Sequence, residues 1–145
     1  MKEAILSVKD LSVSFHMYDG GLEQYDLKVI SNLTLDVRPG EIVAIAGSSG
    51  SGKSLFAHAV MGLLPENAGM TGEVFYKGKV LAQKDKEALR GTEMALVPQS
   101  VSYLDPLMTI GAQVRGTKPN RQIIKAQKEI FKRLHLKEET ERLYP

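Results

Sequence analysis

Gly47-Ser48-Ser49-Gly50-Ser51-Gly52-Lys53-Ser54 is the stretch that decides the fold of this 145-residue chain. It follows Ile42-Val43-Ala44-Ile45-Ala46, which is apolar at every position and predicts a central strand covered on both faces of a parallel sheet. It leads into Lys53–Leu64, where apolar residues recur at helical spacing until Pro65. The predicted order is therefore strand, glycine-rich loop, helix.

This order predicts a site for the phosphates of a nucleoside triphosphate, most simply ATP. Glycines let the backbone N–H groups of a tight loop converge on an anion, and the positive end of the following helix strengthens the site. Lys53 would reach the β and γ oxygens, and the Ser54 hydroxyl would ligate Mg²⁺. The alternative is a loop that only joins a strand to a helix, and the flanking elements argue against it. The predicted cofactor-binding set is Gly47, Ser48, Ser49, Gly50, Ser51, Gly52, Lys53, Ser54 and Leu55.

Composition excludes several other classes of function. The net charge of +2 comes from 19 basic and 17 acidic side chains with no basic stripe, so no nucleic-acid partner is expected. The chain has no cysteine, which excludes disulfides, thiolate metal sites and a cysteine nucleophile. Its N-terminus lacks the apolar run of a secretory signal, and no apolar stretch is long enough to span a bilayer. Work at a membrane would therefore require docking onto a protein that spans it.

Six other segments have a recognisable pattern. Residues 11–15 and 33–37 alternate apolar and polar side chains, which predicts an antiparallel sheet with one solvated face. Glu73–Tyr76 and Lys79–Leu81 flank Lys77-Gly78 and predict a hairpin. Met94–Val97 is a candidate short strand. Asn120 is a candidate cap for a helix with one apolar face formed by Ile123, Ile124, Ile130, Phe131 and Leu134.

The sequence as a whole resembles the ATP-binding subunits of ABC transporters, specifically the oligopeptide/dipeptide/nickel importer group. The opening strand, the approach to the glycine loop, the Q-loop and a segment after it all contribute. The matching stretches are Asp10–Phe15, Pro39-Gly40-Glu41, Gly47–Ser54, Leu89-Arg90-Gly91, Val97-Pro98-Gln99, Leu104-Asp105-Pro106 and Thr109-Ile110-Gly111. Asp105 stands where the group more usually has Asn.

The resemblance implies an α/β fold, a P-loop NTPase of the ABC ATPase type with an N-terminal antiparallel β-subdomain. Residues 1–100 would form that subdomain and the P-loop part of the core up to the Q-loop, and residues 101–145 the start of the helical subdomain. Lys53 and Gln99 would be catalytic, with Gln99 sensing Mg²⁺ and the attacking water, and ATP and Mg²⁺ would be the cofactors. Phe15 would stack on adenine, with Tyr18 and Tyr25 as rivals.

Several parts of the family pattern are missing. The sequence has no Leu-Ser-Gly-Gly signature and no apolar strand ending in Asp-Glu, and none of His16, His58 and His135 lies in the context of the switch histidine. No carboxylate is a candidate general base. We therefore expect an N-terminal portion, truncated before most of the helical subdomain and the later core strands, that binds ATP without turning it over alone. Ile42–Ala46 would then lie at a stripped sheet edge prone to self-association.

The resemblance implies the energy-coupling subunit of an importer for peptides, nickel or similar small solutes, hydrolysing ATP as a full-length dimer. The partners would be a second ATP-binding subunit arranged head to tail, transmembrane permease subunits and, indirectly, a periplasmic or lipid-anchored solute-binding protein. The subunit would be cytoplasmic, on the inner face of the membrane. Two alternatives stay open: a nucleotide-binding module without hydrolysis, and another P-loop NTPase such as a small kinase or GTPase, which would need a motif such as Asn-Lys-x-Asp that is not found.

Overall fold

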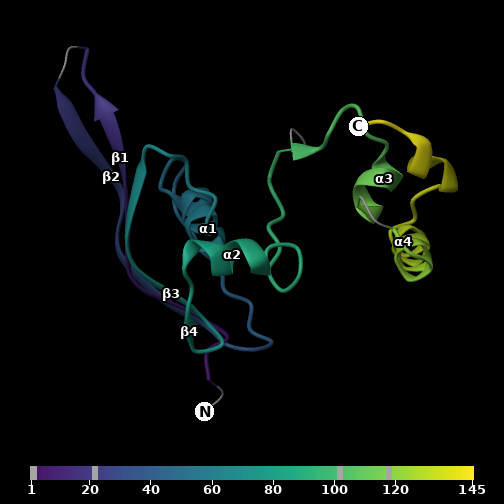
Figure 1. Ribbon diagram of the computed structural model, residues 1–145, viewed down its shortest axis with the longest axis horizontal. Coiled ribbons are helices and arrows are strands. Elements are labelled where there is room, and N and C mark those ends of the chain that lie inside the picture. Colours follow the sequence, from purple (N-terminus) through teal and green to yellow (C-terminus); the bar gives the residue numbers. More distant parts are fainter. Residues whose placement is uncertain (1–2, 21–22, 101–102, 117–118) are drawn as a thin grey trace. The chain divides into compact units, whose positions relative to one another are not determined.

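The computed structural model describes residues 3–20, 23–100, 103–116 and 119–145 (Figure 1). The chain forms two compact units, Met1–Leu96 and Val97–Pro145. In the residues described, the first unit is a sheet with two helices, and the regular elements of the second are helices. The glycine-rich loop belongs to the first unit and Gln99 to the second.

A four-stranded antiparallel sheet forms the frame of the first unit. Its strands are β1 (Leu6–Tyr18), β2 (Gln24–Val37), β3 (Ala68–Tyr76) and β4 (Lys79–Val80), in the order β2-β1-β3-β4. The predicted pairing of residues 11–15 with the second alternating segment is confirmed, since Leu11 lies opposite Leu33. The hairpin around Lys77-Gly78 is also confirmed, because both residues have the positive φ angles that a two-residue turn requires.

One face of this sheet is apolar and the other polar, as the alternation predicts. Val8, Leu11 and Val13 are fully buried, while on the polar side Ser12 Oγ accepts a hydrogen bond from the Asn32 backbone N–H at 2.9 Å. Val8 and Leu11 are three positions apart, which breaks the period of two. The register shifts between these two residues, which brings both side chains to the buried face.

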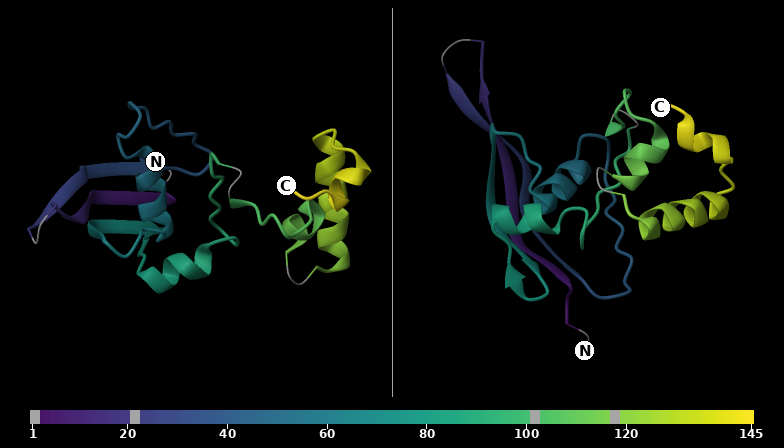
Figure 2. Two further views of the ribbon diagram at one scale, coloured as in Figure 1. Left: turned by 90° about the horizontal axis from the view of Figure 1, so that it is seen from above. Right: turned by 45° about the vertical axis from the view of Figure 1, so that its right-hand side comes forward.

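Two helices cover the apolar face: α1 (Lys53–Met61) and α2 (Gln83–Leu89) (Figures 1 and 2). The α1 helix confirms the one predicted after the glycine loop, and it ends at Gly62, a residue in the left-handed conformation that commonly stops helices. The core joins the sheet to α1 and to the chain that leads into α2. It consists of Val8, Leu11, Val13, Ile30, Phe56, Ala59, Val60, Val74 and Leu81.

The predicted central strand at Ile42–Ala46 is wrong. These residues belong to no strand, Ile42 is 96% exposed, and Val43 and Ile45 are partly exposed. A strand needs a neighbour on at least one side, and none of the described residues forms a backbone hydrogen bond with this segment. The predicted strand at Met94–Val97 is also wrong, because Met94 makes only an isolated bridge to Arg90.

The second unit contains α3 (Ile110–Arg115), α4 (Arg121–Arg133) and the 3₁₀ helix η2 (Glu138–Arg142). The predicted cap of α4 is confirmed: Asn120 Oδ1 accepts from the Ile123 N–H at 2.9 Å. Arg115 ties the three helices together, with Nη1 donating at 3.1 Å to Gln127 Oε1 and to Glu141 Oε2. The predicted apolar face is only partly buried: Phe131 is covered, but Ile130 and Leu134 are exposed.

Candidate phosphate-binding site

The glycine-rich loop is held in place from two sides. It closes with a turn in which the Ser51 N–H donates to Ser48 O at 3.3 Å. Gly52 caps α1 with φ 89° and ψ 6°, and a Cβ added there would lie 3.1 Å from Ile30 Cγ1 on β2. Phe56, buried one turn further along α1, donates its backbone N–H to Gly52 O at 2.8 Å. The loop therefore takes its shape from β2 and α1.

Lys53 folds its side chain back over this loop. Its Nζ donates to Gly47 O at 2.8 Å and to Ser48 O at 2.6 Å, with Ser51 Oγ at 3.4 Å. The ammonium group is thus held within the curve of the loop, next to the first turn of α1, which contains no acidic residue. The free N–H groups of that turn and the positive end of the helix dipole favour an anion at the same place.

A cavity of about 260 Å³ adjoins the loop. Apolar side chains of β2 form one wall and the loop forms another, and Lys53 is the only charged residue in the lining. The lining residues are Val29, Ile30, Ser31, Leu33, Ile45, Ala46, Gly47, Ser51, Gly52, Lys53 and Phe56. A site with one cation and no carboxylate suits phosphate oxygens.

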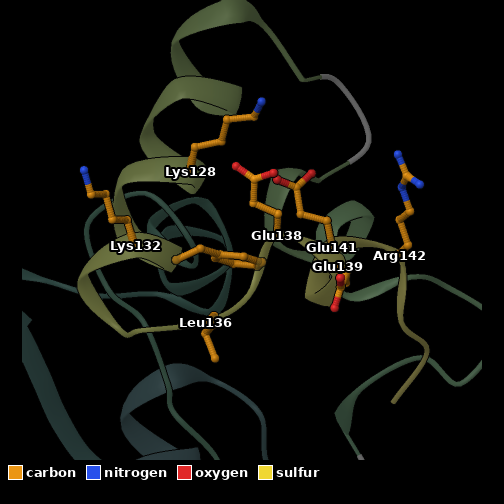
Figure 3. A pocket seen from close by; sticks show the side chains of 8 residues that line it. Lys128, Lys132, Leu136, Glu138, Glu139, Glu141 and Arg142 are labelled. Carbon is orange, nitrogen blue, oxygen red and sulfur yellow. The ribbon is translucent and has the colours of Figure 1, made fainter.

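The second unit has a larger cavity, of about 740 Å³, between α4 and η2 (Figure 3). Lys128 and Lys132 project from α4, and Glu138, Glu139 and Glu141 come from the η2 side. The three carboxylates offset the charges of Lys128, Lys132 and Arg142, so this cavity presents no net positive charge to a triphosphate and is the poorer candidate for this ligand.

The structure places the other predicted site residues as follows. Ser54 is exposed in the first turn of α1, and Leu55 is partly buried against the core. Phe15 is partly buried within the sheet, opposite Leu27 and Ala68, whereas Tyr18 is 67% exposed. Gln99 is exposed in the second unit. The structure therefore brings Lys53 together with Gly47, Ser48 and Ser51, while the roles of Phe15 and Gln99 stay predictions.

Sequence reasoning missed Lys86, a buried lysine of α2. Its side chain is 3% exposed, and burial lowers the pKa of its ammonium group below the ordinary value. The segment Gln83–Leu89 has too few apolar residues for a helical stripe, so no helix was expected there. The signal that could have found α2 is Asp85, which receives the Ala82 N–H at 3.0 Å from the third helical position.

No helix in the described ranges is long and apolar enough to cross a membrane. No three side chains of His, Asp or Glu type come close enough together in those ranges to hold a metal ion.

Comparison with known proteins identifies the family. Residues 30–144 match the profile of the ABC transporter family. The chain belongs to this family. The match covers the P-loop, α1, β3 and nearly all of the second unit, and it confirms the resemblance drawn from the sequence.

Curated relatives of this ABC transporter chain are peptide-transport proteins. It is 39% identical over 118 residues to the dipeptide transport ATP-binding protein DppD of Lactococcus lactis, covering 78% of this chain and 32% of that protein. It is 33% identical over 145 residues to DppD of Bacillus subtilis, covering 92% and 41%. The oligopeptide transport ATP-binding protein OppD of Escherichia coli is 35% identical over 116 residues, with 77% and 33% covered. The chain thus spans about a third of the length of these relatives.

A solved ATP-binding cassette has a similar structure. The cassette MJ0796, a dimer in a post-hydrolysis state bound to ADP and phosphate, superposes with a TM-score of 0.74 and 26% sequence identity. The likeness covers 97% of this chain and 61% of that one. It confirms the predicted fold, an ABC-type ATPase with an N-terminal antiparallel sheet.

Proposed function

We propose that this chain binds ATP with Mg²⁺ on the loop Gly47–Ser54 and acts as part of the energy-coupling subunit of an ABC importer. The observation that carries the proposal is the position of the Lys53 ammonium group, 2.6–2.8 Å from two carbonyl oxygens inside the loop. A phosphate oxygen would compete for this cation and would also accept from the free N–H groups of α1.

The loop fits the cofactor that the family implies. A Cβ at Gly47 would lie 2.5 Å from Ser51 Oγ, so a side chain there would require the Ser51 hydroxyl to move within the loop. Ser54, exposed at the first turn, has the hydroxyl that would ligate Mg²⁺, and Gln99 is proposed as a second oxygen ligand. Phe15 is proposed to stack on adenine, with Tyr18 and Tyr25 as rivals.

Replacing Lys53 with Met tests the site. Loss of the charge-assisted contacts to phosphate should cost about 1.5–3 kcal/mol, which is roughly ten- to hundredfold in the dissociation constant for Mg-ATP. Lys84, an exposed lysine of α2, is the matched control, and Lys84→Met should bind like the parent chain. Equal affinity of the parent chain and the Lys53→Met variant, measured by titration calorimetry, would sink the assignment of the loop.

The transported solute and the partners are proposed from the relatives. DppD and OppD are described as dipeptide and oligopeptide transport ATP-binding proteins, so peptides are the first solutes to test, with nickel and other small solutes next. The proposed partners are a second ATP-binding subunit, transmembrane permease subunits and, through them, a solute-binding protein. This places the subunit on the inner face of the cell membrane. Co-purification with the permease subunits on membranes is the test, and failure to sediment with them would contradict the proposal.

A second proposal concerns turnover by the 145-residue chain alone. No carboxylate lines the cavity beside the loop in the described ranges, so nothing there would polarise an attacking water. The chain should therefore bind ATP without hydrolysing it. Steady release of phosphate that disappears in the Lys53→Met variant would contradict this.

A further inference from the structure

Lys86 is the only charged side chain that is buried in the described part of the chain. It forms no ion pair with any described carboxylate, since the ion pairs of the first unit involve other basic residues. An ammonium group in such a place loses most of its hydration without the compensation of an opposite charge. The burial of the Lys86 ammonium group therefore needs a physical explanation, because its desolvation is unfavourable.

The contacts of Lys86 lie at the C-terminal end of α1. Its Nζ donates to Ala59 O at 2.9 Å, and it lies 4.0 Å from Met70 Sδ on β3. One turn earlier on α2, Gln83 Nε2 donates to Gly62 O at 2.9 Å. Ala59 O also accepts from the Gly62 N–H at 3.2 Å, so Lys86 is its second donor, and the negative end of the helix dipole makes this carbonyl a favourable place for a buried cation.

The side chains of Gln83 and Lys86 lie close to the end of α1. A Cβ added to Gly62, the residue that ends α1, would lie 2.7 Å from Gln83 Oε1 and 3.1 Å from Lys86 Cδ. A side chain at Gly62 would therefore require these two side chains of α2 to move. The end of α1 is therefore held by hydrogen bonds to the carbonyls of Ala59 and Gly62, in addition to the apolar contacts of the helix.

The opposite end of α1 carries the proposed nucleotide site. The helix has nine residues, about 13 Å, and begins with Lys53 and Ser54. A rigid element of this length transmits a tilt or a slide at one end to the other. Apolar contacts through Phe56 and Val60 resist separation from the sheet, but they are not directional.

We infer that Lys86 is a positioning residue for the nucleotide site: by its hydrogen bond to the Ala59 carbonyl near the C-terminal end of α1, it fixes where Lys53 and the P-loop lie. The inference rests on the proposed ATP-binding function. An apolar side chain of the same length would fill the space but would leave Ala59 O without this donor.

The experiment compares three variants of the full chain. Lys86→Met removes the charge at nearly constant length. Val74→Ala weakens the core from β3 without touching the end of α1, and Lys84→Met removes an exposed charge from the same helix. Each variant is measured for Mg-ATP affinity, urea midpoint and hydrogen exchange of residues 47–61.

The Lys86→Met variant should bind Mg-ATP about three- to tenfold more weakly, with faster exchange in α1 and the loop, while its urea midpoint stays level or rises. The Val74→Ala variant should lose stability with unchanged affinity, and Lys84→Met should change neither. Lys86→Met with the affinity and exchange of the parent chain would overturn the inference. If the parent chain binds no nucleotide, the proposed function fails, while the exchange of residues 47–54 in the free protein still decides whether Lys86 positions the loop.

Discussion

Replacing Gly52 with Ala should destabilise the chain more than replacing Gly50 with Ala in the same loop. Gly52 has φ 89°, and an alanine in this left-handed region costs about 1–2 kcal/mol. The new Cβ would lie 3.1 Å from Ile30 Cγ1 and 3.2 Å from Val29 Cγ1. Ile30 is buried in the core and cannot move aside freely, so crowding should add about 1–3 kcal/mol.

The total of roughly 2–5 kcal/mol is a large part of the 5–15 kcal/mol that stabilises a typical domain. Gly50 offers a matched control within the same loop. It also has a positive φ, 79°, but an added Cβ would meet nothing within 4 Å. Gly50→Ala should therefore cost only the backbone share, about 1–2 kcal/mol.

Urea unfolding followed by circular dichroism separates the two variants. With a slope of about 1–3 kcal/mol per molar urea, the crowding at Gly52 should lower the midpoint by roughly 1 M more than Gly50→Ala does. Equal midpoints for the two variants would refute the argument, because they would mean that β2 yields to the new methyl group without cost.

Two further changes give measurable outcomes. Burial lowers the pKa of Lys86 in the folded chain below the value of about 10.5 expected in the unfolded chain, so the folded chain releases this proton at lower pH. The free energy of unfolding should consequently rise with pH between the pKa of Lys86 in the folded chain and its pKa in the unfolded chain. Urea titrations of the Lys86→Met variant should lack this rise. A rise of the same size in the variant would contradict the assignment. Asn120→Ala should destabilise α4 by about 0.5–2 kcal/mol, because the hydrogen bond from the Ile123 N–H to the Asn120 side chain is lost. The effect is measured as faster hydrogen exchange at residues 121–124. Unchanged exchange would mean that the cap contributes nothing.

The parts of the fold that were predictable are those that local pattern determines. The pairing of β1 with β2 follows from alternation, and the cap of α4 follows from Asn120, because it depends on residues close in sequence. The α1 helix was expected to run to Leu64 but ends at Met61. The register shift between Val8 and Leu11 was not predictable, since nothing in the alternation marks where a strand will bulge. The hydrogen bond from Lys86 to the Ala59 carbonyl joins residues that are 27 positions apart in the sequence, and nothing in the sequence of α2 indicates it.

The missing strand at Ile42–Ala46 shows which neighbouring elements the predicted phosphate site depends on. Five consecutive apolar residues favour a covered strand, but a strand forms only where neighbouring backbones complete its hydrogen bonds, and pattern alone does not supply them. The loop that follows is nevertheless well formed, because its supports come from elsewhere: Gly52 packs on β2, and Phe56 anchors α1 in the core. The geometry around Lys53 thus depends on the packing of α1, which follows the loop in sequence, and on the contact of the loop with β2. It follows that substitutions in β2 and α1 should disturb nucleotide binding more than Ile42→Ser, which alters a side chain that is 96% exposed.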